Sequence, residues 1–133
     1  INASDADPVE AIRELTGGRG ADYTIEAIGI AEVMRQAYDS ARRGGTIAII
    51  GIASADAELI LPAQQIPRDE KRLLGSYYGS TRQRVDMPRL LDLYRTGHLK
   101  LDELVTQTYP IDEVQQAFDD VEAGKNARGV LIF

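Results

Sequence analysis

Two hydrophobic patterns alternate along the first half of the chain. Segments with apolar residues every three or four positions predict amphipathic helices, and short unbroken apolar runs predict strands buried on both faces. The first helix has Asp7 as its predicted N-cap, Glu10 as a capping-box acid and Gly17-Gly18 as its stop. The predicted elements that follow are a strand at 22–28, a helix at about 31–41 ended by Gly44-Gly45, and a strand at 46–50. This order favours parallel strands joined by right-handed crossovers, which is an α/β fold.

The second half continues with shorter segments. The pattern predicts an edge strand at 58–62, a strand at 72–77, a helix at 85–96, a strand at 104–109, an amphipathic helix at 111–123 and a final strand at 129–133. Pro62 at the exit of the first of these suits an edge position, because proline cannot donate to a strand ladder. Neither an internal repeat nor a low-complexity linker is present.

Composition excludes several classes of protein. The 133 residues include no cysteine and one histidine, which excludes disulfides and makes a zinc site on this chain improbable. The net charge of −6 argues against a nucleic-acid partner. No stretch of 18 apolar residues predicts a membrane span and no signal-peptide pattern is present, so a cytoplasmic location is the default expectation. The chain begins without Met, as a fragment or a processed product would.

Glycine recurs where three predicted strands end. The segments concerned are Ala27-Ile28-Gly29, Ile50-Gly51-Ile52 and Gly75-Ser76-Tyr77-Tyr78. A glycine at the carboxyl end of a strand lets a ligand approach the backbone, although it can also simply begin the next loop. Because parallel strands end at the same edge, three such glycines favour a flat ligand lying across the strand ends.

The charged candidates are less specific. Arg128 follows a helix stop and precedes the last strand, where a guanidinium can bind a phosphate or simply face solvent. His98 lies just past a helix end, which favours a structural role. Arg42-Arg43 and Lys71-Arg72 are interpreted as surface charges. The segment 18–23 lacks the last glycine of a Gly-x-Gly-x-x-Gly motif, and Gly124-Lys125 lacks the upstream glycine of a phosphate loop.

Taken in order, these segments resemble the carboxyl-terminal part of the zinc-dependent, medium-chain alcohol dehydrogenases. The similarity covers nearly all of the chain. It is carried by Gly20-Ala21-Asp22-Tyr23-Thr24-Ile25-Glu26-Ala27-Ile28-Gly29, Arg43-Gly44-Gly45-Thr46-Ile47-Ala48-Ile49-Ile50-Gly51, Leu74-Gly75-Ser76-Tyr77-Tyr78-Gly79, residues 97–106 with Tyr109-Pro110, Ala117-Phe118-Asp119-Asp120, Gly124-Lys125 and Arg128-Gly129-Val130.

The resemblance implies a role for each candidate segment. Ile50-Gly51-Ile52 passes beneath the nicotinamide ring, and Ser76-Tyr77-Tyr78 adds backbone contacts to its carboxamide. Ala27-Ile28-Gly29 lies along the adenosine side of the cofactor, and Arg128 binds the pyrophosphate. Leu59-Ile60-Leu61 matches an edge strand that pairs with its two-fold mate, so a homodimer is expected.

The resemblance also implies what this chain lacks. The family's zinc ligands, its glycine-rich loop and the acid that reads the ribose lie upstream of Ile1, so the cofactor can be NAD or NADP and the chain alone should not catalyse a reaction. Residues 1–77 are expected to be the second half of a Rossmann-type domain, a parallel sheet with flanking helices. Residues 78–133 are expected to be a small α+β segment of the catalytic domain that, when alone, exposes apolar surface, is mobile, or is buried against a neighbouring chain.

Three other functions stay open at this point. A zinc-free quinone or enoyl reductase of the same superfamily would share these motifs, and the sequence upstream would distinguish it by the absence of cysteine and histidine ligands. A non-catalytic nucleotide-binding α/β module would bind cofactor and act on a partner. A bare fragment would dimerise and bind nothing.

Overall fold

The computed structural model describes residues 1–133, which form two compact units: unit 1 is Ile1–Thr81 and unit 2 is Arg82–Phe133. The elements of unit 1 are α1 (Pro8–Leu15), β1 (Ala21–Glu26), α2 (Ala31–Ser40), β2 (Ala41–Ile49), α3 (Gln65–Asp69), β3 (Arg72–Gly75) and the 3-10 turn η1 (Tyr78–Ser80).

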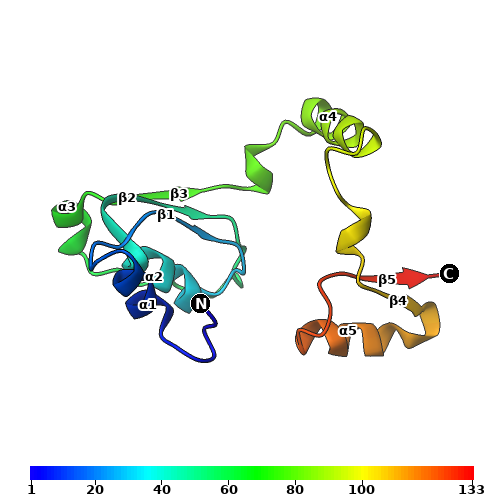
Figure 1. Ribbon diagram of the computed structural model, residues 1–133, viewed down its shortest axis with the longest axis horizontal. Coiled ribbons are helices and arrows are strands. Elements are labelled where there is room, and N and C mark those ends of the chain that lie inside the picture. The colour runs from blue at the N-terminus through cyan, green and yellow to red at the C-terminus, as the bar shows by residue number, and fades with distance from the viewer. The chain divides into compact units, whose positions relative to one another are not determined.

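Unit 1 is built on a three-stranded parallel sheet in the order β1-β2-β3. Helices α1 and α2 lie together below it in Figure 1, and Thr24 of β1 donates its hydroxyl to the carbonyl of Ala37 in α2 at 2.9 Å. The core lies between α2 and β2, where Tyr38, Ala41 and Ile47 are buried against one another. The predicted α/β class with parallel strands is therefore confirmed.

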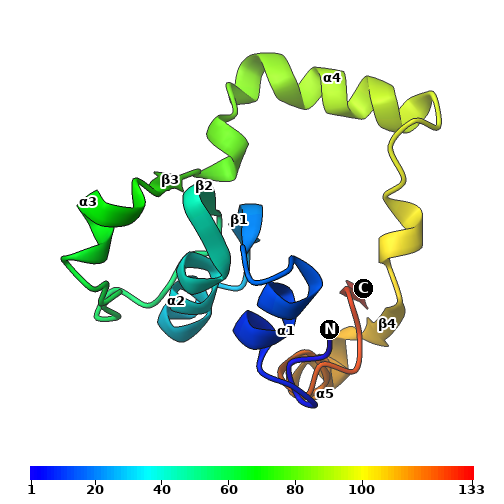
Figure 2. The same cartoon turned by 60° about the vertical axis from the view of Figure 1, so that its left-hand side comes forward.

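The other face of this sheet is bare. Tyr23 and Ile25 alternate along β1 and are 76% and 69% exposed, and Leu74 of β3, in register with Ile25 through Ala48, is 53% exposed. Both helices that cover the sheet, α1 and α2, lie on its other side, as Figure 1 and Figure 2 show. Unit 1 thus buries only one face of a sheet whose apolar pattern predicts burial on both.

Helix α1 begins as predicted. The Oδ1 atom of Asp7 accepts hydrogen bonds from the backbone N–H groups of Val9 at 2.8 Å and Glu10 at 3.2 Å. Glu10 does not complete a capping box, because its carboxylate pairs instead with Arg13 one turn on, at 3.1 Å. The side chain of Asp7 alone therefore satisfies two of the free donors at the helix start.

Replacing Asp7 by alanine is expected to lower the free energy of unfolding of unit 1 by about 1 kcal/mol, because both donors lose their acceptor. Asp7→Asn is the matched control, since an asparagine carbonyl caps a helix about as well as a carboxylate. Urea denaturation followed by circular dichroism measures both. An asparagine variant as unstable as the alanine variant would show that the cap's hydrogen bonds are not what stabilises the helix start.

The start of β2 differs from the prediction. The strand begins at Ala41 rather than Thr46, directly after α2, so Gly44-Gly45 lies inside the strand and does not end the helix. Ala21 pairs with Ala41 but Tyr23 pairs with Thr46, so the extra residues of β2 form a bulge. Gly44 has a φ of +67°, and a Cβ on Gly45 would lie 2.8 Å from the carbonyl oxygen of Arg42. The glycines mark the bulge.

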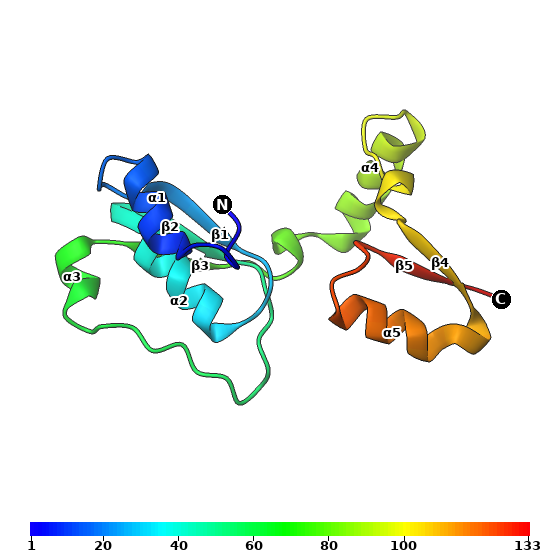
Figure 3. The same cartoon turned by 60° about the horizontal axis from the view of Figure 1, so that its bottom comes forward.

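The predicted edge strand at 58–62 is wrong for the single chain. These residues belong to the long irregular connection between β2 and α3 that Figure 3 shows. Leu61 packs against the core, and the carbonyl of Ile60 accepts a hydrogen bond from Arg35 Nη1 at 3.0 Å. No strand of the chain pairs with this segment, and one of its backbone acceptors is bound instead by the side chain of Arg35 on α2.

Unit 2 contains α4 (Gln83–Arg95), η2 (Asp102–Leu104), β4 (Gln107–Pro110), η3 (Ile111–Glu113), α5 (Val114–Glu122) and β5 (Gly129–Ile132). Strands β4 and β5 pair in parallel. The strand predicted at 104–109 begins three residues later in the structure, at Gln107. The first predicted residues lie at the end of η2 and in the link that follows it. The predicted helix at 111–123 opens as the separate 3-10 turn η3.

The interior of unit 2 is small. Tyr109 is its only buried apolar residue, and the tyrosine hydroxyl donates to Asp120 at 3.0 Å and accepts from Asn126 at 2.8 Å. No residue of α4 or α5 is buried, and Phe118 is 63% exposed. Of the three outcomes expected for this part of the chain, the structure shows exposed apolar surface.

Candidate functional site

The predicted cofactor segments 27–29, 50–52 and 76–78 follow β1, β2 and β3 at one edge of the sheet. We call this the carboxyl edge. The backbone N–H of Ile50 donates to the carbonyl of Glu26 at 2.8 Å, and that of Ser76 donates to the carbonyl of Ile49 at 2.9 Å. The structure therefore brings together all the predicted site residues of unit 1.

Glu26 organises this edge and was missed from the sequence. It is the last residue of β1, is only 2% exposed, and its Oε1 accepts from the backbone N–H groups of Ile28 and Gly29, both at 2.7 Å. Its other carboxylate oxygen is buried without a partner. The available signal was an acidic residue inside the apolar run Ile25-Glu26-Ala27, where a carboxylate needs backbone donors to be buried.

The loops that carry Gly29 and Gly51 touch each other. A Cβ built on Gly51 would lie 2.2 Å from the backbone nitrogen of Gly29 and 2.6 Å from Oε2 of Glu26. A Cβ built on Gly29, whose φ is +89°, would lie 2.4 Å from the carbonyl oxygen of Ile52. Contact between the two loops thus accounts for both glycines, whereas the sequence interpretation rested on the approach of a ligand. Their contact with a cofactor stays a prediction.

The end of β3 is more open. A Cβ on Gly75 would meet no atom within 4 Å. Beyond it Tyr77 and Tyr78 are exposed, and their rings meet edge to face with centroids 4.5 Å apart. Tyr78 adopts a φ of +50°, in the left-handed region. The exposed side chains of Ile28 and Ile52 on the other two loops give this edge an apolar lining.

A hollow of about 360 Å³ lies beside Gly29. It is formed by residues 29–32 at the start of α2 and by Ser54, Ala57 and Glu58. The carboxylates of Glu32 and Glu58 make it unsuited to a phosphate group, because like charges repel, but able to accept hydrogen bonds from hydroxyl groups.

Arg128 belongs to unit 2 and immediately precedes β5. Its backbone carbonyl accepts from the N–H of Thr106 at 3.1 Å, and its own N–H donates to the hydroxyl of Thr106 at 3.3 Å. The backbone is thereby fixed within unit 2, and the side chain is exposed. A role with the carboxyl edge of unit 1 stays a prediction.

No group of three or more His, Cys, Asp and Glu side chains in the structure is placed to hold a metal ion. The residues present therefore do not form a zinc site. None of the helices has the length and apolar character required to cross a membrane.

The sequence profile described as "Zinc-binding dehydrogenase" matches residues 1–96. The chain is 36% identical to the NDMA-dependent alcohol dehydrogenase of Amycolatopsis methanolica, across 98% of this chain and 36% of that protein. It is 38% identical to an alcohol dehydrogenase class-3 of Dictyostelium discoideum, across 89% of this chain and 31% of that protein.

Solved structures agree with the sequences. The benzyl alcohol dehydrogenase of Acinetobacter calcoaceticus superposes with a TM-score of 0.82 at 30% identity, across 98% of this chain and 36% of that one. The alcohol dehydrogenase of Aeropyrum pernix gives 0.79 at 26% identity, across 98% of this chain and 36% of that one. The chain thus spans about a third of the length of the proteins it matches. It belongs to the zinc-binding dehydrogenase family and corresponds to the carboxyl-terminal part of its alcohol dehydrogenases.

Proposed function

We propose that this chain is the cofactor-binding portion of an NAD(P)-dependent, zinc-dependent alcohol dehydrogenase. The observation that carries the proposal is the carboxyl edge, where the ends of three adjacent parallel strands meet in a chain that is similar to alcohol dehydrogenases throughout. In open α/β sheets, ligands bind outside the carboxyl ends of the strands. The nicotinamide cofactor supplies the hydride chemistry when bound, and the residues of this chain hold and orient it.

The three loops would divide this work. The backbone of Ile50-Gly51-Ile52 and Ser76-Tyr77-Tyr78 would hold the nicotinamide end, with the open end of β3 next to them. Ala27-Ile28-Gly29 would lie along the adenosine, beside the hollow whose carboxylates accept from hydroxyl groups. Because phosphates do not suit that hollow, the proposal gives the pyrophosphate to Arg128, whose guanidinium can form two parallel hydrogen bonds.

Zinc would be bound outside this chain, because its residues form no metal site. The chain alone is therefore proposed to be catalytically inactive and, in an intact enzyme, to position the cofactor against a small alcohol or aldehyde. We also propose that residues 59–61 pair with a second copy. Their backbone has no strand partner within the chain, and Ile60 is 74% exposed. Neither nucleic acid nor membrane is proposed as a partner.

Titration of the isotopically labelled chain with NADH tests the proposal. The amide resonances of residues 28–29, 51–52 and 76–78 are expected to shift in a saturable manner, because the cofactor would lie across them. Shifts confined to other parts of the chain would contradict it. A zinc-free quinone or enoyl reductase would bind NADPH or NADH at the same edge, so oxidation of alcohols by the protein that contains this chain, and its loss on zinc removal, distinguishes the dehydrogenase.

Arg128→Ala is expected to weaken cofactor binding by roughly 1–3 kcal/mol, the range for a hydrogen bond to a charged group. Calorimetry with NADH on the protein that contains this chain measures the effect. Arg95→Ala is the control, because Arg95 is also an exposed arginine of unit 2, with a side chain 75% exposed. An affinity for NADH that is unchanged in Arg128→Ala would remove Arg128 from the site.

A further inference from the structure

Basic side chains gather at the opposite edge of the sheet, where β1, β2 and β3 begin. Three adjoining surface hollows of about 320, 490 and 270 Å³ share Arg43 as a lining residue. We call their basic lining residues the basic rim; they are Arg13, Arg19, Arg42, Arg43, Arg68 and Lys71. The rim holds six of the 15 lysines and arginines in a chain whose net charge is −6.

Acids pair with four of the rim's cations: Asp22 with Arg19 and Arg42, Glu10 with Arg13, and Asp69 with Arg43. Only Asp39 and Asp69 line the same hollows. The side chain of Asp69 is 16% exposed, whereas that of its partner Arg43, whose Nε lies 3.3 Å away, is 75% exposed. Asp39 is 27% exposed and pairs with Arg35 on α2. Asp69 thus lies deeper than Arg43, whereas Glu10 and Asp22 are about as exposed as the arginines they bind, and the six cations of the rim outnumber these four acids.

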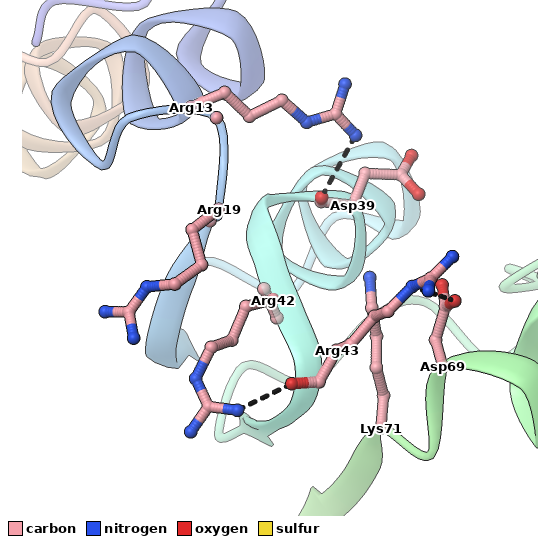
Figure 4. Close-up of a pocket in the computed structure, with 10 residues that line it drawn as sticks. Arg13, Arg19, Asp39, Arg42, Arg43, Asp69 and Lys71 are labelled. Carbon is pink, nitrogen blue, oxygen red and sulfur yellow. Dashed lines mark hydrogen bonds and ion pairs between the residues drawn. The ribbon is translucent and has the colours of Figure 1, made fainter.

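Several donors of the rim remain free. Arg43 uses only Nε in its ion pair, so the other two guanidinium nitrogens have no partner in the structure. Lys71 donates one hydrogen bond to the carbonyl of Tyr38 at 2.7 Å, and its Nζ lies 4.4 Å from the centre of the Tyr38 ring. Figure 4 shows the two side chains projecting side by side beside Asp39 and Asp69. Burial lowers the pKa of Lys71, so an anion that binds there would favour its charged form.

We propose that the basic rim binds a small anion that carries two or more phosphate groups. Guanidinium groups form paired hydrogen bonds with phosphate oxygens, and cations spread over adjoining hollows suit an extended anion better than a single compact one. The rim lies at the amino ends of the strands, so this site is separate from the carboxyl edge, and the two sites can be occupied independently.

Inorganic pyrophosphate is the probe for the test, titrated into the full chain by calorimetry and by amide resonance mapping. Saturable binding is expected, with shifts at residues 18–20, 42–43 and 71 and an affinity that falls as salt rises. Arg43→Gln is expected to weaken binding about tenfold, the loss of one charge-assisted hydrogen bond. Arg95→Gln is the matched control, because its side chain is also 75% exposed and ion-paired with an aspartate, and its affinity should equal that of the wild type.

Arg68→Gln is a second variant, because Arg68 is exposed and has no ion pair whose loss could disturb the fold. It is expected to melt like the wild type and to bind about threefold more weakly. Non-saturating shifts, an equal loss in Arg95→Gln, or wild-type affinity in both rim variants would overturn the proposal. Shifts at 28–29, 51–52 and 76–78 would overturn it too, by assigning the anion to the carboxyl edge. Since NADH is titrated at that other edge, failure here leaves the proposed function standing.

Discussion

Replacing Gly51 by alanine is expected to destabilise unit 1 by about 3 kcal/mol, the upper part of the range for overpacking. The added methyl group would lie 2.2 Å from the backbone nitrogen of Gly29 and 2.6 Å from the buried Oε2 of Glu26. Neither atom belongs to a flexible side-chain end that could move aside, because the backbone of Gly29 is itself bound to Glu26. The two loops would have to separate.

Gly75→Ala is the matched control. Gly75 also ends a strand at the carboxyl edge, but its methyl group would meet no atom within 4 Å, so a change within about 0.5 kcal/mol is expected. Hydrogen exchange of the Ile47 amide measures both variants, because the fully buried Ile47 reports the unfolding of unit 1. If Gly51→Ala were as stable as Gly75→Ala, the contact between the loops would not be what requires glycine at position 51.

This comparison separates two explanations of the same residue. From the sequence, Gly51 is a position where a ligand approaches bare backbone; in the structure, the backbone that approaches is that of Gly29. The two glycines are 22 positions apart, and nothing in either local pattern indicates that their loops touch. Such contacts depend on the turn that each strand makes at its end, which hydrophobic periodicity does not describe.

The elements that could be predicted are those with a local cause. The apolar runs ending at Glu26 and Ile49 are parallel strands, and the order of elements along the chain is enough to place their ends at one edge. The N-cap at Asp7 follows from the local sequence at 7–10. For this reason, the sequence alone groups the segments at the carboxyl edge.

The errors come from contacts between distant segments. Gly44-Gly45 looks like a helix stop, yet the bulge it forms exists only because β2 must stay in register with β1. Similarly, the basic residues at 42–43 and 71 look like separate surface charges. They become neighbours because two parallel strands begin side by side, which gathers charges spread over almost 60 residues into the rim around Arg43.

Glu26→Ala is expected to cost unit 1 about 3 kcal/mol, because two backbone donors lose a charged acceptor inside the protein. Those donors, the N–H groups of Ile28 and Gly29, have no other hydrogen-bond partner in the structure, and the loop between β1 and α2 would lose its shape. The exposed side chain of Glu14, on α1, has no hydrogen bond or ion pair, and Glu14→Ala is expected to change stability by less than about 0.5 kcal/mol.

Glu26→Gln separates the hydrogen bonds from the charge. An amide oxygen can still accept from Ile28 and Gly29, but its NH₂ group would take the place of Oε2, which is buried and has no partner. A loss of about 1–2 kcal/mol is therefore expected, smaller than for alanine. Hydrogen exchange of the Ile47 amide again gives the free energies. If the glutamine variant lost as much as the alanine variant, the negative charge would be the stabilising feature; if neither lost stability, Glu26 would not organise the carboxyl edge.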